Sequence, residues 1–474
     1  MNAAASVRRI ERAALLAALR EPRPWDVLVL GGGATGLGIA VDAAARGLRT
    51  ALIEARDFAS GTSSRSTKLI HGGVRYLAQG NVKLVREALA ERALLIANAP
   101  GLVHPMEFIV PCYRPLEREV MRVGLGIYDA LAGSRGIGPT RWLTRAETIR
   151  RLPTVRTAGL HGGVSYWDAQ FDDARLAIAL MRTACRLGAT AINYVGVETI
   201  EVAEGRVAAV AATDAETGER FRLRARVIFN ATGVWVDRLR TLADASARPI
   251  VAVSRGSHIV VGSKFLPGER ALMIPKTSDG RVLFAIPWMG SLVVGTTDVP
   301  ICEVEWEPQP SAAEVDFIIE TARGYLRDPI RIDDITGTFA GLRPLLAKGV
   351  RGATKTLSRE HSIVVEHGNF ITVTGGKWTT YRRMAVDALA QATRRGLIPD
   401  GQSTTDSLRI DLDPVLEAAR KSAQEGALPT ALRYYADLAR DCEQARSVSD
   451  LLDRRLRIGL TNRARAAQAA GALG

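Results

Sequence analysis

Short apolar runs separated by glycine-rich turns mark the first part of the chain. Residues 25–30 (WDVLVL) form a compact apolar run, which is typical of a buried strand. Residues 39–46 have the composition of a helix, and a glycine follows as a stop signal. A second apolar run at residues 49–53 ends in Glu54. The pattern predicts a strand, a helix and a second strand, with a glycine-rich turn at residues 31–38 leading into the helix.

The turn GGGATGLG has the G-x-G-x-x-G spacing of a dinucleotide-binding unit, with contacts expected from Gly31, Gly33, Ala34, Thr35 and Gly36. The first glycine permits the tight turn, the second lets backbone N–H groups approach a pyrophosphate, and the third lets the helix pack close to the strand. The positive end of the helix dipole favours phosphate. Glu54 is placed to bind the ribose hydroxyls of an adenosine that carries no 2′-phosphate. For the motif alone, a glycine-rich turn in an unrelated α/β unit is the alternative.

Two later segments favour FAD over NAD as the cofactor. Residues 226–233 (RVIFNATG) form an apolar strand ending in Ala231, Thr232 and Gly233, after hairpin-like segments at 197–212 and 220–226. Residues 370–381 (FITVTGGKWTTY) repeat the order of strand, glycine pair and helix, and a helix N-terminus there can stabilise negative charge on a reduced flavin ring. An ordinary strand-to-helix turn explains either segment alone. Together with the N-terminal unit they predict a flavin site, with contacts at Gly376, Lys377, Trp378 and Thr379.

A polar run after the second strand is a further candidate for the cofactor site. Its hydroxyls and single ammonium suit a pyrophosphate and a flavin ring edge, through Ser63, Ser64, Thr67 and Lys68. A solvated serine-rich loop is the alternative.

The composition is that of a soluble globular protein, with 47% apolar and 24% charged residues among 474. This length predicts two to three domains. Four widely spaced cysteines suit a reducing compartment, and six histidines without paired spacing predict no metal site. No apolar run approaches the 18 or so residues of a membrane-spanning helix.

The net charge of +13 is the one unusual bulk property. Such an excess suits nucleic acid, an anionic membrane surface or an anionic ligand. We expect no nucleic-acid partner, because aromatic residues make up only 5% and no basic run is interleaved with them. Residues 5–20 and 118–132 are amphipathic and are candidates for membrane-surface contact, with packing on the protein as the alternative for each.

Several motifs, in order along residues 22–390, resemble the FAD-dependent, quinone-linked glycerol-3-phosphate dehydrogenases. They are GGGATGLG (31–38), DA (42–43), GTSSRSTKLIHGGVRYL (61–77), YWDAQFDDARL (166–176), GSHIV (256–260), GTTDV (295–299), GLRPL (341–345) and GGKWTTYR (375–382). Beyond them, DLLDRRL at 450–456 resembles an Arg-Arg segment of the family.

The resemblance implies an α/β fold with three parts. These are a glutathione-reductase-like FAD-binding Rossmann domain, a mixed-sheet substrate domain similar to D-amino-acid oxidase, and a small helical C-terminal cap. The expected division is an N-terminal extension (1–21), the FAD-binding domain (22–72, 157–231 and 340–402), the substrate domain (73–156 and 232–339) and the cap (403–474). Further FAD contacts implied by the resemblance are Leu69, His71, Gly72, Gly73 and Val197.

The resemblance also implies a reaction. In that family sn-glycerol 3-phosphate is oxidised to dihydroxyacetone phosphate, FAD is reduced, and a membrane quinone reoxidises it. A peripheral protein at the cytoplasmic face of the inner membrane, in contact with an anionic membrane surface, is the matching location, with a soluble cytoplasmic protein as the alternative. A homodimer is compatible with the resemblance. A glycerol-phosphate oxidase that uses O2, and a related amine or amino-acid oxidase, remain alternative activities.

Such a substrate needs planar cations for its phosphate and a base near its hydroxyl proton. By resemblance the catalytic residues are His258, Arg343 and Lys377, and the substrate-binding residues are Arg75, Tyr76, Arg281, Arg343 and Arg359. His258 can act as a base near neutral pH, and His71 is its rival for that role. The alternatives are a structural histidine for His258, a helix-capping surface lysine for Lys377 and solvated surface groups for the arginines.

Overall fold

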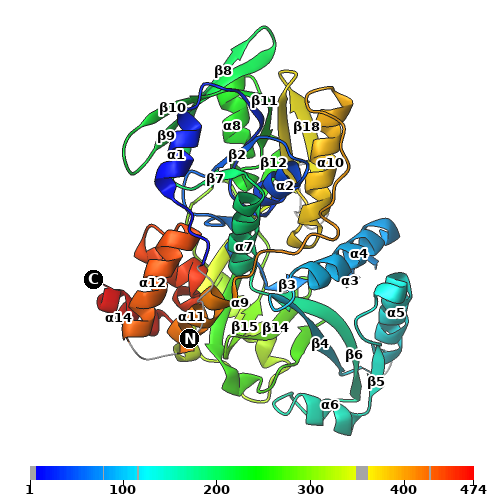
Figure 1. Cartoon of the computed structure of the whole chain (residues 1–474). Helices are drawn as coiled ribbons and strands as arrows, with labels where there is room; N and C mark the ends of the chain where they lie inside the picture. The colour runs from blue at the N-terminus through cyan, green and yellow to red at the C-terminus, as the bar shows by residue number, and fades with distance from the viewer. Residues whose placement is uncertain (1–6, 78–79, 115–116, 348–360, 426–428, 474) are drawn as a thin grey trace, which may run out of the picture.

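The computed structural model describes residues 7–77, 80–114, 117–347, 361–425 and 429–473. They form two large β-sheets, a small three-stranded sheet and a group of C-terminal helices (Figure 1). This arrangement confirms the predicted α/β fold with mixed sheets and a helical C-terminal region.

A six-stranded sheet carries the predicted dinucleotide-binding unit. Its order is β18-β19-β11-β1-β2-β7, and only β18 runs antiparallel to its neighbour. The strands are β1 (Trp25–Leu30), β2 (Thr50–Ile53), β7 (Thr190–Ile192), β11 (Ala225–Asn230), β18 (His361–Glu366) and β19 (Phe370–Gly375). Because β1 lies inside a parallel sheet that is covered on both faces, its apolar residues form a continuous run rather than alternating with polar ones.

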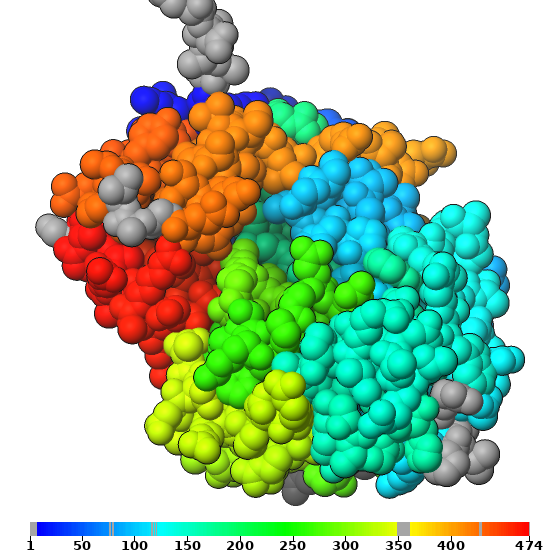
Figure 2. Space-filling model, turned by 90° about the horizontal axis from the view of Figure 1, so that it is seen from below, coloured from blue at the N-terminus to red at the C-terminus, as the bar shows by residue number. Residues whose placement is uncertain are grey.

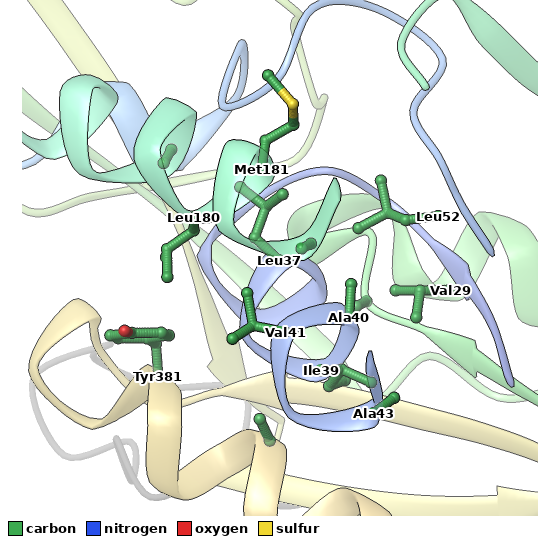
Figure 3. Close-up of a cluster of buried hydrophobic side chains, with 14 of the residues drawn as sticks. Val29, Leu37, Ile39, Ala40, Val41, Ala43, Leu52, Leu180, Met181 and Tyr381 are labelled. Atoms are coloured by element: carbon green, nitrogen blue, oxygen red, sulfur yellow. The ribbon is translucent and has the colours of Figure 1, made fainter. Parts of the chain in front are cut away.

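Helix α2 (Ala34–Ala45) packs between this sheet and two other helices, α7 (Asp173–Arg186) and α10 (Tyr381–Arg394). Figure 3 shows Leu37 and Val41 of α2 beside Leu180 of α7 and Tyr381 of α10, all of them buried. The α2–α10 contact is close, since a Cβ atom at Gly38 would lie 2.8 Å from the Tyr381 ring. The start of α2 is therefore held in a fixed place above the sheet.

A ten-stranded mixed sheet forms the second half of the molecule. Most of it follows the order β16-β12-β15-β14-β13-β4-β6-β3, with β17 paired to β12 and β5 paired to β6. Its strands are β3 (Leu69–Ile70), β4 (Val103–Cys112), β5 (Arg141–Leu143), β6 (Gly162–Phe171), β12 (Val251–Gly262), β13 (Ala271–Ile274), β14 (Leu283–Trp288), β15 (Ser291–Gly295), β16 (Val299–Ile301) and β17 (Ile335–Leu346). Helices α3 (Val74–Leu77), α4 (Val82–Asn98), α5 (Glu117–Ala132), α6 (Arg145–Arg151) and α9 (Ala312–Arg323) flank it.

The predicted hairpins form the small antiparallel sheet β10-β9-β8, made of β8 (Val195–Ala203), β9 (Arg206–Asp214) and β10 (Arg220–Leu223). Glu204 and Gly205 turn the chain between β8 and β9 with φ angles of 51° and 71°. Helix α8 (Val236–Ala243) follows β11.

The C-terminal helices gather on one side of the molecule, shown in orange and red in Figures 1 and 2. They are α11 (Pro414–Glu425), α12 (Pro429–Glu443), the π-helical turn η8 (Asp450–Arg455), α13 (Ile458–Thr461) and α14 (Arg463–Leu473). They share a small apolar core of their own, centred on Tyr435, Ala439 and Leu456. We call residues 414–473 the cap.

The strand pairing divides the chain differently from the predicted domain limits. Strand β6 and the last residues of β17 pair within the ten-stranded sheet, whereas residues 157–171 and 340–346 were assigned to the FAD-binding domain. The pairing partners of these strands are distant in sequence, so the local pattern gives no sign of them.

The two amphipathic segments differ in how they pack. In the first, α1 (Arg12–Arg20) buries Leu16 and Leu19 against the protein, which favours the packing alternative for its described residues. In the second, α5 buries Leu125 and Tyr128 but leaves Val123 and Ile127 exposed. No helix in the described part of the chain is long and apolar enough to cross a membrane.

Candidate cofactor and substrate site

The turn between β1 and α2 is shaped by its glycines. Gly31 has a φ of 106°, and a Cβ atom there would lie 2.8 Å from the carbonyl oxygen of Ala231. A Cβ atom at Gly36 would lie 1.9 Å from the carbonyl oxygen of Gly31. Helix α2 begins directly after Gly33, so its first N–H groups point toward the turn. The backbone thus forms an open cradle at a helix N-terminus, which suits a pyrophosphate.

Glu54 stands at the end of β2 beside this cradle. Its carboxylate accepts hydrogen bonds from the N–H groups of Gly32 (2.6 Å) and Arg56 (2.9 Å), which orient the side chain. Burial raises the pKa of Glu54, and the two backbone donors act against that rise. An oriented, partly desolvated carboxylate at this position fits the predicted role of binding ribose hydroxyls.

A cavity of about 370 Å³ extends from this cradle to the ten-stranded sheet. Most of the predicted cofactor contacts line it. They are Gly31, Gly33, Ala34, Thr35, Glu54, Ser63, Thr67, Leu69, His71, Val197, Ala231, Thr232, Gly233, Gly376, Lys377, Trp378 and Thr379. A cavity of this size, lined by the phosphate cradle and by Glu54, fits a dinucleotide such as FAD.

The loop of residues 62–68 forms one wall of this cavity. The N–H of Ala34 donates to the Ser63 hydroxyl (2.9 Å), and the indole of Trp378 donates to the Ser63 carbonyl oxygen (2.8 Å). The loop therefore connects α2 to the segment after β19. These contacts place the serine-rich run against the cavity, in contrast to the alternative of a solvated loop.

Five predicted cofactor residues do not line this cavity: Gly36, Ser64, Lys68, Gly72 and Gly73. Gly36 serves the helix–strand packing instead. Lys68 is fully buried behind the loop, where its ammonium donates to the Ser64 carbonyl oxygen (2.8 Å) and to Asp173 (2.7 Å). The prediction of a cofactor contact for Lys68 overlooked this pairing, because Asp173 lies far along the chain.

A second, smaller cavity of about 150 Å³ adjoins the first, and Thr67, Leu69, His71 and Arg343 line both. Gly73 and the predicted substrate residue Arg281 also line the smaller one. Arg281 is paired with Asp279, two residues before it (Nε–Oδ2 2.7 Å). The structure thus brings Arg343 and Arg281 together at a space of the size of a small polar molecule.

Arg343 is held in place by the turn after β15. Its guanidinium donates to the Thr296 hydroxyl (3.0 Å) and the Thr297 carbonyl oxygen (3.0 Å), and it lies 3.3 Å from Asp298. A Cβ atom at Gly256 would lie 2.1 Å from this guanidinium, so a side chain there would displace the guanidinium from its present position. These contacts orient a cation between the two cavities.

His258 lies on β12, buried at the wall of the larger cavity. Its Nε2 atom is 3.1 Å from the Thr67 hydroxyl, and its ring stacks on Phe339 with centroids 4.6 Å apart. Burial, together with the charges of Lys68 and Arg343, holds the pKa of His258 well below 6.5. The imidazole is therefore neutral at pH 7 and able to accept a proton.

The remaining predicted site residues are placed less completely. Lys377 lines the larger cavity two residues after the end of β19. Arg75 and Tyr76 belong to α3, but their side chains lie outside the described part of the structure. Arg359 lies outside the described residues altogether.

Several cavity residues were not predicted from the sequence. Trp235 and Trp306 stack face to face at the wall of the larger cavity, with centroids 4.0 Å apart, and Arg65 donates to the Trp306 carbonyl oxygen (3.0 Å). Asp168 and Asp298 line the smaller cavity. Trp235 follows the Ala-Thr-Gly turn and Arg65 and Asp298 lie within the quoted motifs, so their positions in the sequence could have indicated them. Trp306 has no such indication.

Comparison with known proteins decides the family. The family model described as FAD dependent oxidoreductase matches residues 26–382, which is most of the chain. The chain belongs to the FAD-dependent oxidoreductase family. For this FAD-dependent oxidoreductase the predicted cofactor, FAD, and the predicted fold class are thereby confirmed.

Individual relatives of this FAD-dependent oxidoreductase carry a narrower name. A mitochondrial glycerol-3-phosphate dehydrogenase of Arabidopsis thaliana is 40% identical over 417 residues, covering 85% of this chain and 66% of the relative. The mitochondrial glycerol-3-phosphate dehydrogenase of Homo sapiens is 39% identical over 412 residues, covering 84% of this chain and 56% of the relative. The chain thus spans between about half and two thirds of the length of these curated relatives.

Solved structures agree with the fold of this oxidoreductase. A glycerol-3-phosphate dehydrogenase from Bacillus halodurans complexed with FAD is 28% identical, with a TM-score of 0.77 over 98% of this chain and 91% of that chain. A glycine oxidase from Geobacillus kaustophilus is 21% identical, with a TM-score of 0.58 over 82% of this chain and 99% of that chain, and shows the fold alone.

Proposed function

We propose that this flavoprotein oxidises sn-glycerol 3-phosphate to dihydroxyacetone phosphate. The observation that carries the proposal is the small cavity beside the FAD cavity, lined by Arg343 and Arg281 and adjoining His258 through Thr67. Two guanidinium groups suit the phosphate of the substrate, and a neutral imidazole suits its hydroxyl proton. The names of the relatives, which are glycerol-3-phosphate dehydrogenases, support the same substrate.

Each residue has a distinct part in this proposal. When bound, FAD would supply the hydride acceptor for the substrate carbon that carries the hydroxyl group. Arg343 binds the phosphate and, being held by the turn after β15, sets where the rest of the substrate lies. His258 takes the hydroxyl proton.

Anaerobic titration of the yellow holoenzyme with glycerol 3-phosphate tests this proposal. We expect the flavin absorbance near its visible maximum to bleach at stoichiometric substrate. Bleaching by glycine, sarcosine or a D-amino acid, with glycerol 3-phosphate inert, would make the protein an amine or amino-acid oxidase instead.

A membrane quinone is the electron acceptor in this proposal. Turnover with a water-soluble quinone analogue should exceed turnover with O2. If hydrogen peroxide forms at the full turnover rate in air and added quinone changes nothing, the protein is a glycerol-phosphate oxidase.

The location we propose is peripheral, on an anionic membrane surface at the cytoplasmic face. Its support is the outer face of α5, which exposes Val123 and Ile127 and lies at the outer edge of the molecule in Figure 1. The exposed cations Arg122 and Arg135 lie on and beside this helix, and the whole chain carries +13. An apolar ridge flanked by cations suits acidic lipid headgroups. No described surface specifically favours a second copy of the chain, so the homodimer is not part of this proposal.

A further inference from the structure

Buried arginines of the cap contact the loop of residues 62–68 on the side that faces away from the FAD cavity. Arg457 is completely buried, and its guanidinium donates to the Ser64 carbonyl oxygen (2.7 Å) and to Asp173 Oδ1 (2.6 Å). Lys68, from the loop itself, donates to the same carbonyl oxygen and to the other oxygen of the Asp173 carboxylate. One carbonyl oxygen and one carboxylate are thus shared by a cation of the loop and a cation of the cap.

The front of the same loop faces the FAD cavity. Asp173 also accepts hydrogen bonds from the N–H (2.9 Å) and the hydroxyl (2.7 Å) of Ser66, which lines that cavity. The next residue, Thr67, bonds His258. A short chain of contacts therefore leads from Arg457 through Asp173 and the loop to the imidazole.

A second loop at the cavity is tied to the cap in the same way. Asp57 lies in the loop after β2, between Ala55 and Ala59, which both line the FAD cavity. Its carboxylate accepts hydrogen bonds from Arg454 Nε (2.5 Å) and Arg455 Nη2 (2.9 Å). Three arginines within four consecutive cap residues, 454–457, thus supply the cations that contact both loops.

Buried ion pairs contribute little net free energy to folding, so stability alone does not explain this cluster of charges. Removing each ion from water has a cost that its partner offsets only in good geometry, and apolar residues of similar volume often stabilise as well or better. Charged hydrogen bonds are, however, short and directional, so they define where a backbone carbonyl and a carboxylate lie. The ion pairs of the cap are therefore suited to fixing the cavity loops in one position.

We propose that the cap segment of residues 454–457 braces the two loops of the FAD cavity, with Arg457 as the positioning residue for the loop of residues 62–68. Without this brace the loop of residues 62–68 adopts more than one position. FAD then binds less tightly, and His258 is less well oriented. The part that concerns FAD depends only on the family, whereas the part that concerns His258 rests on the proposed function.

Release of FAD from the diluted holoenzyme, followed by flavin fluorescence, tests the brace. Residues that orient ligand-holding groups typically cost about 10–100-fold in affinity when removed, as at metal sites, so we expect Arg457→Met to raise the Kd of FAD by about tenfold or more. Arg457→Lys should restore part of the loss, because it keeps the charge. Arg182→Met is the matched control: Arg182 is also buried and donates to the cap at the Cys442 carbonyl oxygen (2.9 Å), but it does not touch either loop.

Two outcomes would overturn the brace. One is a Kd for FAD within twofold of the wild-type value in Arg457→Met with far-ultraviolet circular dichroism unchanged. The other is an equal rise in Arg182→Met, which would indicate general loosening of the cap.

Ser66→Ala keeps every buried charge and provides a second test if Arg457→Met does not fold. It should slow flavin reduction at saturating glycerol 3-phosphate by about tenfold while KM changes little, since Ser66 links Asp173 to the loop. An unchanged reduction rate would contradict the link to His258. If glycerol 3-phosphate fails to reduce the wild-type flavin, the proposed function is wrong, and the Kd for FAD still tests the brace.

Discussion

At the scale of single residues, His258 is the group whose protonation the proposed chemistry depends on. Its pKa lies well below 6.5, so the neutral, proton-accepting form is present throughout the neutral range and is lost only as the pH falls through that lowered value. We expect flavin reduction to stay constant from neutral pH to below pH 6.5 and to decline only in more acidic solution. The sequence alone had suggested a titration near neutrality, because an exposed imidazole has a pKa of about 6.5.

Replacing this histidine separates its contribution from that of the substrate phosphate, which also titrates. His258→Ala should slow single-turnover flavin reduction by about 10²–10⁴-fold. In this variant the decline of the reduction rate in acidic solution that comes from His258 should also be absent. Stopped-flow absorbance across a pH series measures both effects. If His71→Ala produces them and His258→Ala does not, His71 is the base.

Arg343 is the residue on which the phosphate assignment depends. Loss of a hydrogen-bonded charge contact costs about 2 kcal/mol or more, so Arg343→Ala should raise KM for glycerol 3-phosphate by about 30-fold or more while FAD stays bound. Arg323→Ala removes an exposed arginine of α9 and should leave KM unchanged. An unchanged KM in Arg343→Ala, measured with the flavin spectrum intact, excludes this phosphate site.

The cofactor half of the site was more accessible to sequence reasoning than the substrate half. Gly31 and Glu54 belong to one continuous segment, whose spacing alone encodes their geometry. Lys68 shows where this fails: its partner Asp173 is more than 100 positions away, so its burial behind the loop has no local sign. Asp298 lies within the quoted motif of residues 295–299, but its pairing with Arg343 of β17 joins two distant segments and has no local sign.

At the scale of elements, helix α2 can pack close to β1 because Gly36 has no side chain. A Cβ atom at Gly36 would lie 1.9 Å from the Gly31 carbonyl oxygen, a backbone atom that cannot move aside. Gly36→Ala should therefore displace the helix N-terminus and abolish FAD binding, seen as colourless purified protein. Gly124→Ala in α5, where no atom lies within 4 Å of the new methyl group, should keep FAD and gain about 0.5–1 kcal/mol of stability. Yellow Gly36→Ala protein would contradict the packing argument.

Helices and strands with a local sequence pattern could be predicted, whereas the pairing of the strands within the sheets could not. The strand at 25–30 and the hairpin within 197–212 follow from neighbouring residues, and both are found as expected. The pairing of β6 with β4 joins segments about 50 residues apart, and no periodicity within β6 reveals it. The helical cap was predicted as a region, but no clear apolar stripe marks α14 itself.

At the scale of the whole molecule, the net charge of +13 is not accounted for by the ligands alone. Many arginines form ion pairs within the protein, such as Arg175 with Glu443 and Arg240 with Glu366. Cations that stay exposed near an apolar ridge can contribute about 1 kcal/mol each on an acidic membrane. The face of α5 with Val123 and Ile127 is such a ridge, with side chains 60% and 47% exposed.

Binding to lipid vesicles tests this face directly. Val123→Ser combined with Ile127→Ser removes apolar contact worth about 2 kcal/mol if both side chains are partly inserted, so partition onto vesicles with acidic lipids should fall by about 30-fold. The wild-type protein should bind less as salt increases, because screening weakens attraction to the headgroups, and it should bind neutral vesicles poorly.

Ile332→Ser removes an equally exposed side chain (61%) elsewhere on the surface and should leave binding unchanged. Activity with a water-soluble acceptor should be the same in all three proteins, since neither face touches the cavities. If the double variant sediments with acidic vesicles as well as the wild type does, α5 is not the docking face, and the surplus charge must act through another surface.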